Sequence, residues 1–188
     1  MSNHVYVICG PAGAGKTTVA NYLRDQYGMH QVITHTTRAP RQNEVDGVSY
    51  HFETSESIQK LHLLESVTYD GSRYGSSLEG LEEGWKQGQD DVIVLDTKGA
   101  ATYCDKLGDQ VTVIFITVQD KDKLIKRMVD RGDDADSIKA RINSPEYERD
   151  LALPDDLRTH ATDLVTITND DWEQTRKTLD LLVANNIR

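Results

Sequence analysis

A glycine-rich segment near the start of the chain carries the clearest chemical signal. It runs Gly10-Pro11-Ala12-Gly13-Ala14-Gly15-Lys16-Thr17 and matches the phosphate-binding pattern G-x-x-x-x-G-K-[ST]. Glycine lets a backbone bend so that successive N–H groups point at phosphate oxygens. Lys16 adds a positive charge, and the hydroxyl of Thr17 can ligate Mg²⁺. The segment therefore predicts a site for a nucleoside triphosphate, but it does not specify a reaction.

A second segment holds two arginines that could bind another phosphate. Arg38 and Arg41 are three positions apart, and Pro40 lies between them. A rigid pair of guanidinium groups suits bidentate phosphate binding, and Tyr50 or Tyr74 could add a hydroxyl donor. From these residues alone, a solvated basic turn is an equally good interpretation.

An aspartate follows the apolar run at residues 92–95. Phosphate-loop enzymes place a second acidic motif at the end of a strand, where it helps to hold Mg²⁺. Asp96 occupies such a position. An aspartate that ends a strand is common, so this signal depends on the loop. With the loop present, we predict that Thr17 and Asp96 are the metal-binding residues.

The elements that must position these residues alternate along the chain. Strands are expected at residues 4–9, 29–34, 65–69, 92–95, 111–118 and 164–168. Helices are expected from the loop to about residue 27, from 54 or 55 to about 64, and at 77–87, 120–131, 136–153 and 171–185. Strands that are apolar on both faces are typical of a parallel sheet covered by helices. We therefore predict an α/β fold with a doubly wound parallel sheet and ligands at the carboxyl ends of its strands.

A dinucleotide-binding loop is the main alternative for the glycine-rich segment. Its pattern, G-x-G-x-x-G, would require glycine at the position of Thr18. The Gly-Lys-Thr ending has no role in that pattern. The sequence therefore favours a phosphate loop.

Composition limits the range of partners. The chain of 188 residues has a net charge of −10, which argues against general nucleic-acid binding. No apolar run approaches the ~20 residues of a membrane span, and no signal peptide is evident. Cys9 and Cys104 are expected to be reduced core residues. These features predict a cytoplasmic protein of one domain without a nucleic-acid or membrane partner.

The longer segment around the two arginines resembles a known family. It reads Thr36-Thr37-Arg38-Ala39-Pro40-Arg41-Gln42-Asn43-Glu44-Val45-Asp46-Gly47-Val48-Ser49-Tyr50-His51-Phe52, and it is similar to the acceptor-binding segment of guanylate kinases. Stretches around residues 64–65, 74–76, 92–99, 127–141 and 164–171 also resemble that family, in order. The resemblance therefore covers essentially the whole chain. It implies a P-loop kinase of a single domain, 1–188, with a core at 1–33, 88–130 and 160–188, an acceptor-binding insertion at about 34–87 and a lid at about 131–145.

The resemblance also implies roles in acceptor binding. Arg38, Arg41, Tyr50 and Tyr74 would hold the acceptor phosphate of GMP, and Glu44 would support the arginines. Thr34, Glu65 and Ser76 would read the guanine, and Asp96 would also belong to the GMP-binding site. A carboxylate can accept from both guanine N1–H and the 2-amino group, whereas adenine has no such pair of donors. An unpaired Glu65 would cost about 1–3 kcal/mol against the wrong base.

The donor side follows from the same resemblance. Residues 10–17 together with Thr18 and Asn169 would bind ATP. Lys16 would act in catalysis with Arg131 and Arg141 from the lid and with Arg127 beside them. The expected reaction transfers the γ-phosphoryl group of ATP to GMP, with Mg²⁺ as cofactor, and gives ADP and GDP. The expected partners are these small nucleotides, and a monomer is expected, with a dimer left open.

Several positions depart from the family pattern. Val94 stands where an acidic residue is usual, Arg73 where an aromatic is usual and Lys98 where glutamine is usual. Ser144 and Pro145 predict a new helix start beyond the lid. His35 and His51 lie beside acceptor residues, and we interpret them as incidental rather than as metal ligands.

Three alternatives to a GMP kinase follow from these observations. A kinase of the same fold with another acceptor is kept open by Val94 and Arg73. A non-catalytic guanylate-kinase-like binding module is disfavoured, because the loop lysine and the lid arginines are present. A GTPase switch would require an Asn-Lys-x-Asp motif, which the sequence lacks.

Overall fold

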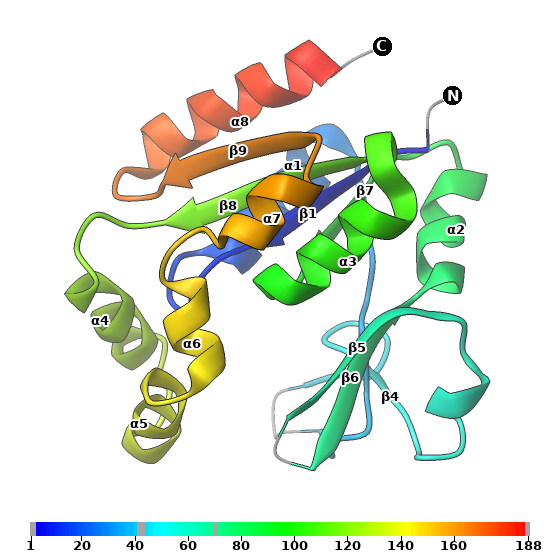
Figure 1. Ribbon diagram of the computed structural model, residues 1–188, viewed down its shortest axis with the longest axis horizontal. Helices are drawn as coiled ribbons and strands as arrows, with labels where there is room; N and C mark the ends of the chain where they lie inside the picture. Colours follow the sequence, from blue (N-terminus) through cyan, green and yellow to red (C-terminus); the bar gives the residue numbers. More distant parts are fainter. Residues whose placement is uncertain (1–2, 41–43, 70, 187–188) are drawn as a thin grey trace.

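A five-stranded parallel sheet positions the glycine-rich loop in the computed structural model, which describes residues 3–40, 44–69 and 71–186 (Figure 1). The strand order is β2-β7-β1-β8-β9, and every neighbouring pair is parallel. The strands span His30–Gln31 (β2), Asp91–Val94 (β7), Val5–Cys9 (β1), Val111–Thr117 (β8) and Asp163–Thr168 (β9). The α/β prediction is confirmed.

Helices cover both faces of this sheet. One face packs against α1 (Lys16–Tyr27) and α8 (Trp172–Asn186), and its core includes Ile8, Leu23 and Leu179. The other face packs against α2 (Leu78–Lys86), α3 (Thr97–Leu107) and α7 (Asp155–His160). All five residues of β1 are buried, which explains why the strand is apolar at every position. Gly28 ends α1 in a left-handed conformation, φ 68°, which agrees with the predicted end of this helix near residue 27.

A smaller sheet lies in the lower right of Figure 1, below α2 and α3. Its order is β4-β3-β6-β5. The strands span His51–Phe52 (β4), His35–Thr36 (β3), Ser72–Ser77 (β6) and Leu63–Tyr69 (β5), with the 3₁₀ helix η1 (Ile58–Lys60) before β5. Strand β6 runs directly into α2, so the small sheet is joined to the core by a helix.

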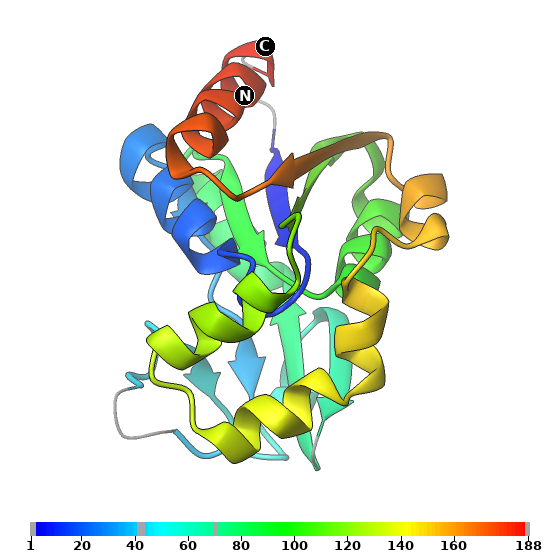
Figure 2. The same ribbon diagram turned by 90° about the vertical axis from the view of Figure 1, so that its left-hand side faces the viewer.

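Three short helices form the other side of the lower half of the molecule (Figure 2). They are α4 (Asp122–Asp130), α5 (Ala135–Ile142) and α6 (Pro145–Asp150), and a further 3₁₀ helix, η2 (Gly108–Gln110), precedes β8. The side chain of Ser144 caps α6 by accepting from Tyr147 N, and Pro145 occupies its first turn. The predicted helix start at Ser144 is therefore confirmed. No helix in the described part of the chain is long and apolar enough to cross a membrane.

Some sequence-based elements were wrong. The helix predicted from residue 54 or 55 to 64 is only the three-residue η1, and the strand predicted at 29–34 is only His30–Gln31. Thr54 and Ser57 do exchange the backbone-to-hydroxyl hydrogen bonds typical of a helix start. The helix does not continue, because β5 already begins at Leu63 to pair with β6. The sequence reading also missed α3 and α7.

Asp91 at the start of β7 should make stability depend on pH. It is fully buried, and its Oδ1 lies 2.7 Å from His30 Nδ1. Its Oδ2 has no hydrogen-bond partner among the described residues. Burial raises the pKa of Asp91 to about 8, well above the ordinary value near 3.9. Because the folded pKa is the higher one, the contribution of Asp91 to stability is most favourable at low pH and is lost as the pH rises from about 4 to 8.

We therefore expect Asp91→Asn to raise the melting temperature, and to raise it more at pH 8 than at pH 5. The amide avoids the cost of burying a charge. Thermal unfolding at the two pH values measures the difference, with the exposed Asp109→Asn as the matched control. A gain of equal size at both pH values, or a loss that grows at pH 8, would contradict the role given to Asp91.

Candidate active site

The glycine-rich loop connects β1 to α1 in a conformation that only glycine suits. Gly10, Gly13 and Gly15 have φ angles of 126°, 83° and 100°. A Cβ on Gly10 would lie 2.1 Å from the backbone oxygen of Ile116. All three glycines are therefore required for the backbone conformation, and Gly10 also for close packing against β8. Gly15 makes no side-chain cap to α1, so this helix end is suited to an anion.

Lys16 lies along the inside of this loop. Its Nζ donates to Gly10 O at 2.7 Å and to Pro11 O at 2.9 Å. Burial lowers the pKa of Lys16 to about 8. A polyanionic ligand beside the ammonium group would favour its charged form.

Two cavities meet at the carboxyl ends of the core strands. The first cavity, of about 370 Å³, lies toward the small sheet, and the second, of about 960 Å³, lies toward α4 and α5. Residues common to both linings are Ala12, Lys16, Tyr50, Val94 and Arg141. Two positive side chains, Lys16 and Arg141, thus stand where the cavities join.

Arg38 projects into the first cavity from the loop after β3. Its Nη2 donates to Glu44 Oε1 at 2.9 Å, and its Nε donates to Tyr74 Oη at 3.2 Å. Its guanidinium carbon lies 5.6 Å from the ring centre of Tyr50. The structure thus brings together four of the residues expected to hold the acceptor phosphate or to support it. Arg41, the fifth, lies outside the described residues.

Glu65 on β5 lines the same cavity together with Thr34. Its Oε1 accepts a hydrogen bond from Ser76 Oγ at 3.0 Å. Burial raises the pKa of Glu65 to about 7, and the bond from Ser76 opposes that rise. Ser76 itself is fully buried and does not line the cavity. The expected direct contact of Ser76 with guanine therefore does not fit this arrangement, because its one proton is already donated to Glu65.

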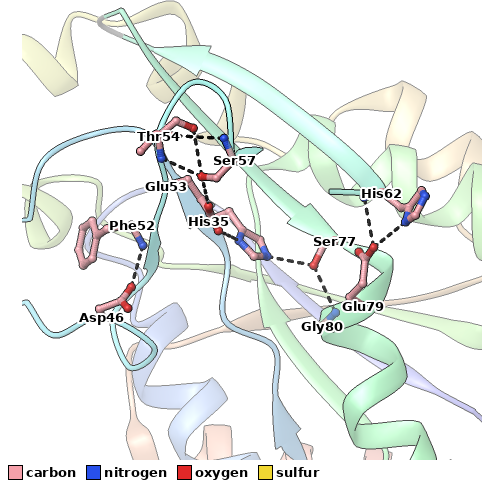
Figure 3. A network of polar contacts seen from close by, with 10 residues as sticks. All are labelled: His35, Asp46, Phe52, Glu53, Thr54, Ser57, His62, Ser77, Glu79 and Gly80. Atoms are coloured by element: carbon pink, nitrogen blue, oxygen red, sulfur yellow. Dashed lines mark hydrogen bonds and ion pairs between the residues drawn. The ribbon is translucent and has the colours of Figure 1, made fainter. Parts of the chain in front are cut away.

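A polar network braces the small sheet behind these residues (Figure 3). The buried ring of His35 contacts Glu53 Oε1 through Nδ1 at 2.8 Å and Ser77 Oγ through Nε2 at 3.0 Å. Ser77 in turn caps α2 by accepting from Gly80 N. Both ring nitrogens of His35 are thus used within the protein. Since His35 follows Thr34 and Ser77 follows Ser76, the network fixes two of the segments that border the first cavity.

Asp96 has two structural partners. Its Oδ1 accepts from Gly99 N at 2.7 Å and caps α3, and its Oδ2 accepts from Arg149 Nη2 at 2.9 Å. Arg149 Nε also donates to Asp150 Oδ1 and to Thr97 Oγ1, at 2.9 and 3.0 Å. Asp96 lines the first cavity, whereas Thr17 lines the second. The two residues predicted as metal ligands therefore do not share a cavity, and Asp96 is already bonded elsewhere.

Sequence reasoning did not identify Arg149. It lies on α6, far along the chain from Asp96, and it has no motif of its own. The only local signal is the helix start at Ser144. It predicts a helix over these residues, but it does not indicate that Arg149 contacts Asp96.

The three arginines expected to act on ATP lie at different places. Arg141 lines both cavities, and Arg127 and Arg131 line the second only. Arg127 is anchored, because its Nη2 donates to Asn169 O at 2.8 Å and its Nη1 approaches Gly13 O at 3.4 Å. Arg131 forms an ion pair with Asp133 near the surface.

Thr18 and Asn169 differ in position. Thr18 is exposed at the start of α1 and lines the second cavity. Asn169 is buried, and it lines neither cavity. Its Nδ2 donates to Ala14 O at 2.8 Å, and its Oδ1 accepts from Thr175 Oγ1 at 2.9 Å. Its side chain supports the loop from behind, rather than facing a nucleotide as expected.

Comparisons with known proteins identify the family. The guanylate kinase family model matches residues 2–185. A guanylate kinase of Campylobacter jejuni (strain RM1221) is 32% identical over 197 residues, covering 100% of this chain and 92% of that protein. A guanylate kinase of Chlamydia abortus is 35% identical over 139 residues, covering 71% of this chain and 67% of that protein.

Solved structures share the fold. A guanylate kinase from Anaplasma phagocytophilum superposes with a TM-score of 0.66 at 22% identity, covering 98% of this chain and 87% of that one. A shikimate kinase from Acinetobacter baumannii gives a TM-score of 0.51 at 15% identity, covering 98% and 96%. At these identities the likeness concerns the fold alone. Because the family model spans nearly the whole sequence and agrees with the motifs, the chain belongs to the guanylate kinase family.

Proposed function

We propose that this protein transfers the γ-phosphoryl group of ATP to GMP and releases ADP and GDP. The observation that carries the proposal is the junction of the two cavities at Lys16 and Arg141. A donor in the second cavity and an acceptor in the first would place their reacting phosphates at that junction. Positive charge is needed there, since the transition state spreads negative charge over the transferring phosphoryl group.

The first cavity suits a nucleoside monophosphate. Arg38, Tyr50 and Tyr74 offer cationic and hydroxyl donors to its phosphate, and Arg41 would join them. Glu65 offers a carboxylate to the base. In its ionised form it would accept from guanine N1–H and the 2-amino group, whereas adenine would leave it unpaired.

The second cavity suits ATP. The backbone of residues 10–17 and the start of α1 would hold the phosphates, with Thr18 beside them. An oxygen of the GMP phosphate would attack the γ-phosphorus, and the bond to the β–γ bridging oxygen would break, leaving its electron pair on ADP. Lys16, Arg141 and Arg131 would stabilise the charge, and the mechanism uses no protein nucleophile. Arg127 would hold the loop in shape through its backbone contacts.

ATP would bring Mg²⁺ to the second cavity. Among the described residues, no group of three or more His, Cys, Asp or Glu side chains is arranged to hold a metal ion. The exposed hydroxyl of Thr17 fits as a single protein ligand beside phosphate oxygens, which is how Mg²⁺ is often held. Asp96 does not fit as a ligand beside Thr17, because it lines only the first cavity and its Oδ2 is paired with the Arg149 guanidinium. When bound, the ion would neutralise charge on the β- and γ-phosphates.

The segment at about 34–87 would then be the acceptor-binding insertion and the segment at about 131–145 the lid, on a core of 1–33, 88–130 and 160–188. Closure of both over the substrates would exclude water and suppress hydrolysis of ATP. The enzyme would act as a monomer in the cytoplasm. The buried free thiols of Cys9 and Cys104 suit a reducing compartment.

A kinase with another acceptor is the second candidate function. Val94 favours it, because an apolar side chain lines both cavities at a position where the family usually has an acidic one. A coupled assay of ADP formation with ATP and GMP, dGMP, AMP, CMP or UMP, each alone, separates the candidates. We expect the largest kcat/KM with a guanine acceptor. ADP formation with AMP but not GMP would contradict guanine recognition, and transfer to none of them would favour a binding module.

A further inference from the structure

A chain of two hydroxyl groups lies behind Glu65. Tyr103 on α3 donates its hydroxyl proton to Ser76 Oγ at 2.8 Å, and Ser76 on β6 donates its own to Glu65 Oε1 at 3.0 Å. Tyr103 and Ser76 are both fully buried. The chain thus runs from a helix of the core, through the small sheet, to a carboxylate at the first cavity.

The surroundings of Tyr103 do not otherwise require a hydroxyl group. Its ring belongs to an apolar cluster that includes Leu81, Ala100 and Cys104. Phenylalanine would fill that space equally well, whereas a buried tyrosine hydroxyl must find a partner. In this protein the partner is Ser76, whose Oγ accepts from Tyr103 and donates its own proton to the hydrogen bond with Glu65.

We propose that Tyr103 is a positioning residue for recognition of the acceptor base. By donating to Ser76, it directs the serine proton onto Glu65 and holds that carboxylate in one orientation toward the first cavity. Hydrogen bonds in such a chain polarise one another, so each strengthens the next. This inference rests on the proposed function, since it assigns Glu65 to the base of GMP.

The same two hydrogen bonds affect the ionisation of Glu65. Burial and the nearby Asp96 raise the pKa of Glu65, whereas the bond from Ser76 and the Lys106 ammonium group lower it, with the result near 7. Tyr103 favours the ionised form by strengthening the bond from Ser76. The ionised carboxylate accepts from two base donors, whereas the protonated acid loses one acceptor. We therefore expect kcat/KM for GMP to rise with pH near 7.

Tyr103→Phe tests the proposal, with Tyr22→Phe as the matched control. Tyr22 donates its hydroxyl to Asp180 between α1 and α8, away from both cavities. We expect Tyr103→Phe to raise KM for GMP by about 3- to 10-fold, the worth of one hydrogen bond. We also expect kcat to stay within about twofold, KM for ATP to be unchanged and the pH profile for GMP to move to higher pH. A variant indistinguishable from Tyr22→Phe would overturn the proposal, and so would an equal loss with both substrates.

A second measurement does not depend on the reaction. The side-chain carboxyl carbon of Glu65 can be titrated by NMR in the wild type, in Tyr103→Phe and in Ser76→Ala. We expect both variants to raise the pKa of Glu65, and we expect Tyr103→Phe to add nothing once Ser76 is alanine, because the connecting hydroxyl is gone. An unchanged pKa of Glu65 in Tyr103→Phe would refute the effect of the Tyr103–Ser76 hydrogen bond on Glu65, even if GMP is the acceptor. A shifted titration in an enzyme that rejects GMP would overturn the proposed function instead.

Discussion

Replacement of Lys16 by methionine is expected to lower kcat by about 10²-fold or more, the usual cost of removing one charge-stabilising group. Lys16 lines both cavities, and its ammonium group lies inside the loop against Gly10 O and Pro11 O. Methionine keeps the length of the side chain but removes the charge that the transferring phosphoryl group would meet. Steady-state turnover with saturating ATP and GMP measures the effect.

Lys86→Met is the matched control for this variant. Lys86 is 72% exposed on α2, where it pairs with Glu82 in a surface ion pair, and such pairs contribute little to stability. Both variants should melt within a few degrees of the wild type. Turnover of Lys16→Met near that of Lys86→Met would refute the role given to the phosphate loop.

Replacement of Arg141 by methionine should have an effect of similar size. Arg141 is the one cavity-lining arginine, among the described residues, that faces both cavities. An arginine that meets a transferring phosphoryl group is worth about 10³-fold or more in kcat. We expect kcat to fall by about 10²- to 10³-fold, with smaller changes in KM for either nucleotide, because the charge acts mainly on the transition state.

Lys139→Met controls for the loss of a positive charge on the same helix. Lys139 is exposed on α5 and lines neither cavity. Its turnover should stay within about twofold of the wild type. If Arg141→Met instead raised KM for GMP and left kcat intact, Arg141 would be a ground-state contact, and the lid arginine would not serve the transfer step.

Basic side chains gather at the two cavities of a chain that is acidic overall. The chain carries a net charge of −10, yet Lys16, Arg38, Arg127, Arg131 and Arg141 all line one cavity or the other. Six carboxylates also line the cavities, those of Glu65, Asp96, Asp133, Asp134, Glu146 and Asp150, so the site offers a few separate positive groups rather than a broad basic surface. Such an arrangement suits a small polyanionic ligand better than extended nucleic acid.

The parts of the site that could be predicted depend on residues that are close together in the sequence. The loop at residues 10–17 depends on glycines whose φ angles only glycine readily adopts, so the loop can be recognised from the order of its residues alone. The contact between Arg38 and Glu44 spans six residues within one loop, and the cap at Ser144 spans three. The Ser144 cap was predicted from the local pattern and the support of the arginines by Glu44 from the family resemblance, and both contacts are present.

The parts that could not be predicted depend on contacts between distant elements. Arg149 meets Asp96 across 53 positions, and Tyr103 meets Ser76 across 27. Helix α3 was missed because it contains Thr97, Gly99 and Thr102, which are weak helix formers. Because that helix was not predicted, Asp96 was interpreted as a metal ligand, and nothing in the sequence indicated that it caps a helix. The position of Asn169 behind the loop likewise follows from packing of α8, which no local pattern encodes.

Transfer of label in a mixture of acceptors tests the central claim most directly. The protein is incubated with ATP labelled in the γ-phosphate, Mg²⁺ and equal concentrations of GMP, AMP, CMP and UMP, and the products are separated. We predict that the label appears in GDP, in step with ADP formation, and that Lys16→Met abolishes it. Label that appears in inorganic phosphate alone, or in the diphosphate of another base, would contradict phosphoryl transfer to GMP.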